Sequence, residues 1–248
     1  MTSITVLFTG ANRPQATRSS LATAILRILS SQALAKLPKG EGSKLIVVDA
    51  SIEVDALPAV KELQDNHGID HLDIVIASAG VSYTWPSVAE LKLDGLRGHL
   101  DPNVYSFITL YQATQTLLQK PSKEPIFTPI GSTAGCIACV FPPPPPPPPL
   151  SLNQLSIPNA AYGPNNAMVN WSTVRINSEE SWLNALVLDP DWLQTDLGNA
   201  GAFRFGAEQA ETTIDASCNG MIKVINESTK EKDGGKMIGW EGGIRGYR

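Results

Sequence analysis

Residues 72–80, LDIVIASAG, and residues 125–132, PIFTPIGS, decide the fold of this chain. Each is a short apolar run, rich in β-branched residues, that ends in small or turn-forming residues, as buried strands do. Between them, residues 88–119 place apolar side chains three or four positions apart, which is the spacing of an amphipathic helix. Two buried strands joined by a long helix indicate a parallel sheet.

The same alternation continues along the rest of the chain. Three further apolar runs, at 4–10, 44–51 and 183–190, are strand candidates, and residues 21–37, 57–68 and 160–182 have helical spacing. We therefore predict an α/β fold: one doubly wound, Rossmann-type parallel sheet, formed by residues 1–248 as a single domain. In such sheets the binding site lies at the carboxyl ends of the strands.

Composition narrows the possible functions. Of the 248 residues 42% are hydrophobic, and no apolar run approaches the roughly 20 residues that span a bilayer. The net charge of −5, without a basic cluster, argues against nucleic acid as a partner. Because the first residues lack the basic flank and cleavage site of a signal peptide, we expect a cytoplasmic protein that does not bind membranes.

Cysteine and histidine give no sign of a metal site. The chain has three cysteines, Cys136, Cys139 and Cys218, and three histidines, His67, His71 and His99. The single C-x-x-C has no second pair and no nearby histidine, so we expect small buried residues rather than zinc ligands. The histidines have polar neighbours in the sequence, and we expect them at the surface.

Residues 141–159, FPPPPPPPPLSLNQLSIPN, interrupt the α/β pattern. Consecutive prolines cannot form helix or sheet and favour an extended polyproline II rod. The eight-proline run would extend about 25 Å at ~3.1 Å per residue. We predict a proline-rich loop insertion at the surface, with a ligand for a proline-recognising domain as the functional alternative.

Four short motifs, in order, carry a resemblance to a known family: TGANR at 9–13, ASAG at 77–80, IGSTAG at 130–135 and YGPNN at 162–166. The chain resembles the short-chain dehydrogenase/reductase family over nearly its whole length, and within it the norsolorinic acid ketoreductase type of fungal aromatic polyketide metabolism. The resemblance implies hydride transfer between NADP(H) and a polycyclic aromatic ketone. It also implies a homodimer or homotetramer.

The resemblance assigns roles to individual residues. Tyr162 is the proton donor and acceptor, Ser132 holds the substrate oxygen, and Asn103 supports a proton-relay water. The positions that match the family's cofactor contacts are Gly10, Asp49, Ser78, Gly80, Asn166 and Thr195.

Asn166 stands where the family has a lysine, four residues after the tyrosine. A free tyrosine has a pKa near 10, and a cation one helical turn away favours the phenolate. Asparagine can bond ribose hydroxyls but carries no charge. The next cation, Arg175, lies about 20 Å further along the helix at ~1.5 Å per residue, so it cannot replace the lysine.

The nucleotide-binding part also departs from the family. Pro14 and Ala16 replace glycines of the phosphate loop, which removes an N–H donor and adds a methyl group. The segment before 44–51 is long enough for about one βαβ unit of roughly 30 residues, where this fold has more, so the first βαβ half is truncated. Either the second strand and its neighbouring helix are missing, or the first helix and its glycine loop are.

Three single substitutions point the same way. Ser78 stands where the family usually has an asparagine. Asp191 stands where the family has a Pro-Gly turn, and we expect its carboxylate to crowd the nicotinamide amide. Pro129 lies inside a strand predicted to be central, where its missing N–H should break the ladder.

Three functional hypotheses remain open at this point. The first is an NADPH-dependent ketoreductase weakened by these changes. The second is a cofactor-independent isomerase, cyclase or dehydratase in which Tyr162 and Ser132 donate hydrogen bonds to an enolate. The third is a non-catalytic paralogue.

Overall fold

The computed structural model describes residues 4–9, 25–27, 47–49, 56–121, 123–137 and 158–246, with the backbone alone at 25–27 and 47–49. Its centre is a parallel sheet with the order β1 (Val6–Phe8), β4 (Ile74–Ala77), β5 (Ile126–Pro129) and β6 (Asn184–Ala185). Two more strands, β2 (Ile25–Arg27) and β3 (Val47–Asp49), pair in parallel, and β2 lies against β1. At the other end, β7 (Val187–Asp189) pairs in parallel with β8 (Met237–Gly239), and β9 (Ile244–Arg245) is antiparallel to β8.

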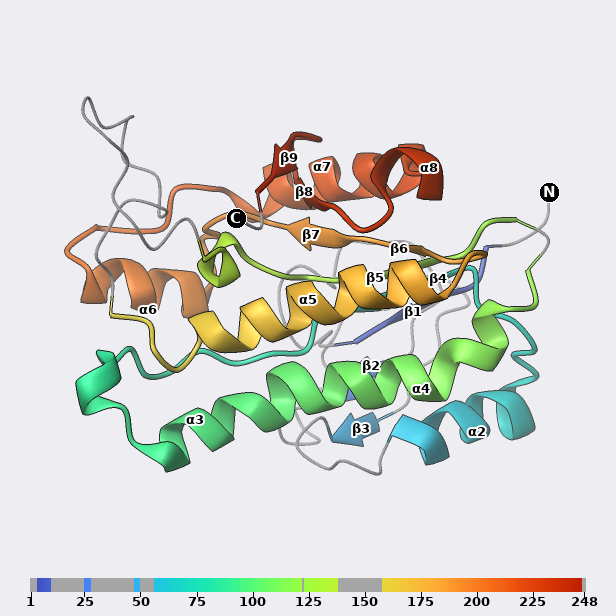
Figure 1. The fold of residues 1–248 in the computed structure, drawn as a ribbon, viewed down its shortest axis with the longest axis horizontal. Coiled ribbons are helices and arrows are strands. Elements are labelled where there is room, and N and C mark those ends of the chain that lie inside the picture. Colours follow the sequence, from blue (N-terminus) through green and yellow to red (C-terminus); the bar gives the residue numbers. More distant parts are fainter. Residues whose placement is uncertain are drawn as a thin grey trace.

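Helices cover both faces of this sheet (Figure 1). One face carries α2 (Ala56–His67), α4 (Ser106–Leu118) and α5 (Gly163–Glu179), and the other carries α7 (Ile214–Glu227). Before α4 come two short elements, η2 (Val88–Glu90) and α3 (Leu93–Leu100), and after β7 come α6 (Asp196–Arg204) and, later, α8 (Lys230–Asp233).

Neighbouring residues of the strands face opposite layers, as the two-residue repeat of a strand requires. Leu7, Val75 and Phe127 pack with α2, α4 and α5, whereas Val6, Ile76 and Ile126 pack with α7. Both faces are apolar because both are covered by helices. The predicted α/β fold with a parallel sheet is confirmed.

The helix predicted over residues 21–37 is wrong at Ile25–Arg27, which form strand β2 and pair residue by residue with Val47–Asp49. A short apolar run can satisfy either spacing, and here hydrogen bonds to a distant strand decide the structure. A strand between β1 and β3 also contradicts the alternative in which the second strand was missing. Residues 10–24, which include the phosphate loop, lie outside the described part of the chain.

Pro129 breaks the ladder on one side only: β5 stays paired with β4 through Pro129, opposite Ala77, whereas its pairing with β6 ends at Phe127 and Ala185. The amide of Ile130 donates to Ala77 O of β4 at 2.9 Å, and the amide of Gly131 donates to Leu188 O on the other side at 2.8 Å. The backbone nitrogen of residue 129 therefore points to the same side as that of Gly131, away from β4. Because proline has no N–H, it cannot donate a hydrogen bond on that side. Opposite it the chain leaves the ladder at Leu186, so that the single strand predicted at 183–190 is divided into β6 and β7.

The surface position predicted for His99 is wrong. Its side chain is fully buried, with Nδ1 2.7 Å from Gly95 O, Nε2 accepting the amide of Tyr83 at 3.3 Å, and its ring stacked on the Tyr83 ring. Both ring nitrogens have partners inside the protein, which removes the cost of burial. His67 and His71 are half-buried.

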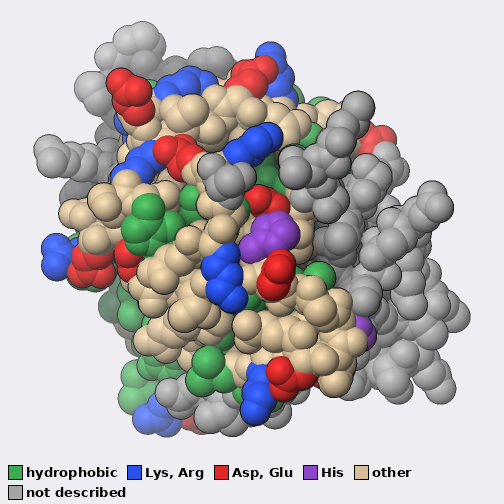
Figure 2. Space-filling view, turned by 90° about the vertical axis from the view of Figure 1, so that its right-hand side faces the viewer, with side chains coloured by type: hydrophobic (Ala, Val, Ile, Leu, Met, Phe, Trp, Pro, Cys, Tyr) green, Lys and Arg blue, Asp and Glu red, His purple; other side chains and the backbone are tan. Residues whose placement is uncertain are grey.

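Cys136 is buried as expected, Cys139 lies outside the described residues, and Cys218 is also buried. Within the described part of the chain no group of His, Cys, Asp or Glu could hold a metal ion, and no helix is long and apolar enough to cross a membrane. Most of the predicted proline insertion, 141–157, is also outside the described residues. Figure 2 shows the end of the molecule where the strands begin, with acidic and basic side chains interspersed.

Candidate functional site

The carboxyl ends of β1, β4, β5 and β7 open into a pocket of about 740 Å³, a volume typical of small-molecule sites. The residues that line it include seven of those predicted from the sequence: Asn103, Ser132, Tyr162, Ser78, Gly80, Asn166 and Thr195. Gly10 lies outside the described residues, and Asp49 is described only as backbone in β3.

Ser132 begins the short turn η4 (Thr133–Gly135) that follows β5. Its Oγ accepts the amide of Ala134 at 3.1 Å and keeps its own O–H to donate. The turn rests directly on α5, because a Cβ on Gly135 would lie 2.5 Å from the amide nitrogen of Ala167. Glycine at this position is what allows Ser132 to stand beside the start of α5.

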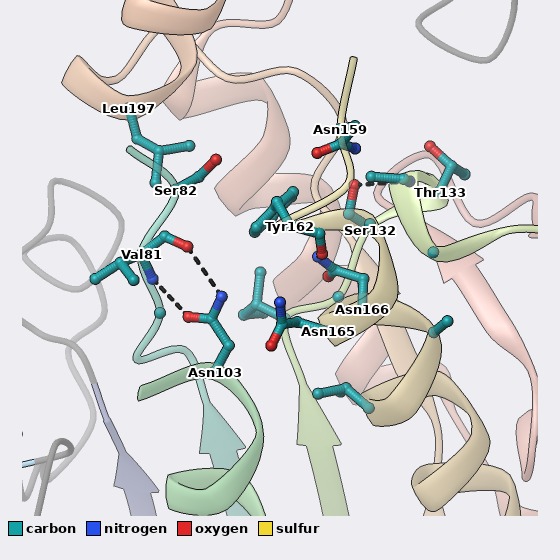
Figure 3. Close-up of a pocket in the computed structure, with 18 of the residues that line it drawn as sticks. Val81, Ser82, Asn103, Ser132, Thr133, Asn159, Tyr162, Asn165, Asn166 and Leu197 are labelled. Carbon is teal, nitrogen blue, oxygen red and sulfur yellow. Dashed lines mark hydrogen bonds between the residues drawn. The ribbon is translucent and has the colours of Figure 1, made fainter. Parts of the chain in front are cut away.

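Tyr162 is the residue immediately before α5, whose first turn contains Pro164. Proline is favoured there because the first amides of a helix have no partner within it. Figure 3 shows Tyr162, Ser132 and Asn166 together on one wall of the pocket, so the structure brings the predicted proton donor and oxygen holder together.

Asn103 faces that wall from a π-helical turn, η3 (Asp101–Tyr105), between α3 and α4. Pro102 cannot donate in this turn, and the amide of Ser106 reaches back five residues to Asp101 O. The Asn103 side chain accepts the amide of Val81 at 2.7 Å and donates to Val81 O at 2.9 Å. It thereby fixes the loop after β4, where Gly80 also contacts it.

Asn166, at the lysine position, is 6% exposed, and its Nδ2 donates to Tyr162 O at 3.1 Å. Its neighbour Asn165 is fully buried and donates in the same way to Ala161 O, while its Oδ1 has no partner. The described residues that line the pocket include no Lys, Arg or His. Arg175 is exposed and paired with Glu179 at 2.6 Å, as expected for a cation that cannot replace the lysine.

Two threonines hold the backbone around the pocket. Thr9, at the end of β1, accepts the amides of Ser78 and Ala79 at 3.0 and 3.2 Å. Thr195 caps α6 by accepting the amide of Gly198 at 3.1 Å. The loop after β4 and the start of α6 are therefore fixed by side chains at the carboxyl ends of the sheet.

Asp191 sits at the edge of the pocket with a φ of +66°, in the left-handed region that glycine prefers. Its carboxylate accepts the amide of Trp192 at 2.8 Å and the hydroxyl of Thr212 at 3.3 Å. The carboxylate is thus bound to the next residue of its turn and to Thr212 on a separate segment, and the turn keeps its left-handed geometry without a glycine.

Asp189, two residues earlier, was missed in the sequence. It lines the pocket and is 3% exposed, and burial raises its pKa to about 6. The signal was present, because an ionisable residue directly follows the apolar run ALVL at 185–188. Perturbed carboxyl groups in clefts are candidates for function.

Comparison with known proteins identifies the relatives. The chain is 35% identical over 222 residues to norsolorinic acid ketoreductase of Dothistroma septosporum, covering 87% of this chain and 77% of the relative. It is 32% identical over 203 residues to a short-chain dehydrogenase of Pyricularia oryzae, covering 81% and 76%. The chain belongs to the short-chain dehydrogenase/reductase family. No family model matches it.

Solved structures of short-chain dehydrogenase/reductase type share the fold. NADPH-bound carbonyl reductase from chicken fatty liver superposes with a TM-score of 0.77 at 21% identity, covering 99% of both chains. Carbonyl reductase Sniffer of D. melanogaster gives 0.79 at 16% identity, covering 98% and 99%. The predicted Rossmann-type fold is therefore confirmed.

Proposed function

We propose that this protein reduces a polycyclic aromatic ketone with NADPH, and that the missing lysine makes the reaction slow. The observation that carries the proposal is the wall formed by Ser132 and Tyr162, which Gly135 packs directly against α5. The names of the relatives, ketoreductases and carbonyl reductases, support the same type of reaction.

The described residues offer polar groups that fit the nicotinamide end of the cofactor, but they offer no positive charge there. Asn166 and Thr195 line the pocket and would hold this end through an amide and a hydroxyl. When bound, NADPH supplies the hydride. The residues that would contact its phosphates, at 10–24, lie outside the described part of the chain.

The chain's own contribution is to hold the substrate and donate a proton. Ser132 donates a hydrogen bond to the ketone oxygen, and Tyr162 gives its phenolic proton to that oxygen as negative charge develops there. Tyr162 is left as a phenolate without a cation among the described residues of the pocket. The proton transfer is therefore uphill compared with that beside a lysine.

An assay of aryl ketone reduction tests this proposal, with the rate measured from the decrease in NADPH absorbance. Tyr162→Phe should slow turnover ~10²–10⁴-fold, the usual contribution of a general acid. Tyr105→Phe, on an exposed tyrosine that does not line the pocket, is the matched control and should leave the rate unchanged. Equal rates for wild type and Tyr162→Phe, or no NADPH binding at millimolar concentration, would contradict the proposal.

A second candidate is proton transfer on the ketone without any nucleotide, as in an isomerase, cyclase or dehydratase. It is favoured by the charge of the pocket, since Asp189 and Asp191 are the charged residues among its described lining and both are acidic. Negative side chains oppose the binding of phosphates. Turnover without nucleotide would favour this candidate, and ketone binding without turnover would favour a non-catalytic paralogue.

We also propose that the protein forms a homo-oligomer. The outer face of α5 exposes Met168, Trp171 and Val174, and exposed apolar side chains grouped on one helix are typical of subunit interfaces. Trp171→Glu should lower the mass measured by light scattering to that of a monomer. An unchanged mass would exclude this face.

A further inference from the structure

Asp189 lies beside the residue predicted to hold the substrate oxygen. It is the last residue of β7, and the preceding Leu188 forms a parallel bridge with Ile130, two residues before Ser132. Neighbouring strands are about 4.8 Å apart, so the parallel register places Asp189 next to Gly131 and the Ser132 turn. Asp189 and Ser132 both line the pocket.

A backbone amide orients the carboxylate. Asp189 Oδ1 accepts the amide of Asp191 at 3.1 Å, and the backbone of Thr133, which follows Ser132, also lowers the pKa of this carboxyl group. The carboxylate is therefore held by the turn after β7, beside the turn after β5. A base needs this kind of fixed position relative to the group that holds its substrate.

The charges around Asp189 allow it to exchange a proton near neutral pH. Burial raises its pKa to about 6, and the charge of Asp191 adds to this. The amides of Asp191 and Thr133 and the guanidinium of Arg245 act in the opposite direction. Arg245, on β9, is itself paired with Glu241 at 2.8 Å, so it neutralises Asp189 incompletely. A carboxyl group that titrates near the working pH is suited to general acid–base catalysis.

We propose that Asp189 is the general base of this pocket and removes a proton from the carbon next to the carbonyl of an aryl alkyl ketone, without a nucleotide. The inference rests on the proposed binding of that carbonyl by Tyr162 and Ser132. It adds an activity that needs neither the lysine nor the cofactor.

The step balances within the pocket. The Asp189 carboxylate takes the α-proton, the electron pair of that C–H bond becomes the C=C bond of the enolate, and the carbonyl π pair moves to oxygen. Tyr162 and Ser132 donate hydrogen bonds to the oxygen as it gains charge. Asp189 then returns a proton to the same carbon, which exchanges it with solvent, or to a conjugated carbon, which moves the double bond.

Deuterium exchange tests the step without cofactor. The wild-type protein is incubated in D₂O with 2-acetonaphthone, a bicyclic aryl methyl ketone, and the methyl signal is followed by proton NMR. We expect exchange at least ten-fold above the protein-free rate, increasing as the pH rises through about 6 because the carboxylate is the active form. Exchange no faster than without protein, or a protein-dependent rate that is constant across that pH range, would overturn the proposal.

Two variants separate the base from its surroundings. Asp189→Asn retains an oxygen that can accept the amide of Asp191 but cannot take the proton, and it should reduce exchange to the protein-free rate. Asp233→Asn changes another buried aspartate, in α8 and outside the pocket lining, and should exchange as the wild type does. Wild-type exchange in Asp189→Asn would overturn the assignment even if the variant were less stable.

Binding of the same ketone, measured through quenching of Trp85 and Trp192 in the pocket wall, distinguishes this inference from the proposed function. If the ketone fails to bind the wild type, the proposed carbonyl site is wrong and the inference falls with it. If it binds to both proteins with similar affinity, and only Asp189→Asn fails to exchange, the inference is supported independently of any reductase activity.

Discussion

Two groups of polar side chains in the pocket differ in what they are bound to. In the Ser132 turn, the hydroxyl accepts one backbone amide and keeps its own hydrogen for a ligand, while Gly135 fixes the turn against α5. In the second group, which consists of Asn166, Asp189 and Asp191, Asn166 Nδ2 donates to the backbone oxygen of Tyr162, and the two carboxylates accept backbone amides. The comparison shows that the Ser132 hydroxyl can still donate to a ligand, whereas the second group mainly bonds the backbone. The described lining of the pocket also holds no cation.

Gly135→Ala would disrupt the packing of the Ser132 turn against α5. The added Cβ would lie 2.5 Å from backbone atoms of Asn166 and Ala167, which cannot move without shifting α5. We expect the free energy of unfolding to fall by about 3 kcal/mol, the cost of severe overpacking, and ketone binding to be lost. Urea unfolding and fluorescence quenching measure the two effects. Gly243→Ala, where a Cβ meets no atom within 4 Å, is the control, and equal stability of the two variants would refute the contact.

Asn166→Lys would add a cation to the second group. A cation one turn from Tyr162 should lower the pKa of that phenol and raise the NADPH-dependent reduction rate at neutral pH ~10-fold, which corresponds to a shift of about one pKa unit. The pH profile of the reduction rate should shift in the acidic direction. Ser178→Lys adds the same charge to an exposed position of α5, outside the pocket lining, and should change neither. An unchanged rate and profile in Asn166→Lys would mean that charge is not what limits this pocket.

The sequence predicted the parts of this site that depend on local pattern. Apolar runs ending in small residues located the strand ends, and seven predicted residues, Tyr162 and Ser132 among them, meet there because parallel strands share one carboxyl edge. Strand β2 and the environment of Asp189 could not be read in this way. Ile25–Arg27 depend on pairing with Val47–Asp49, and Asp189 depends on Thr133 and Arg245, both more than 50 residues away. Residues distant in the chain determine both features.

Asp189 gives the second group a measurable dependence on pH. Its folded pKa of about 6 is above the ordinary value of 3.8, so the native state binds the proton more tightly than the unfolded chain does. This contribution to stability is fully present below pH 3.8 and is lost as the pH rises through 6. At about 1.4 kcal/mol per pKa unit the full loss is ~3 kcal/mol.

Asp189→Asn should therefore gain about 1–3 kcal/mol of unfolding free energy relative to wild type between pH 4 and pH 8, because asparagine never ionises. Urea unfolding of both proteins at the two pH values measures this change, with Asp233→Asn as the control. A wild-type-minus-variant difference that is the same at both pH values would show that the ionisation of Asp189 carries no cost in the fold.

Asp191 offers the smallest effect, and its variants test how much the left-handed backbone of this turn contributes to stability. Its φ of +66° costs an alanine about 1–2 kcal/mol but costs glycine almost nothing. Asp191→Ala should therefore unfold at lower urea than Asp191→Gly, and both variants lose the bonds to Trp192 and Thr212 equally. The difference between the two variants isolates the backbone conformation from these hydrogen bonds. Equal midpoints would mean that the turn relaxes out of the left-handed region once the carboxylate is removed. The Asp191 side chain would then be what holds the turn in this conformation.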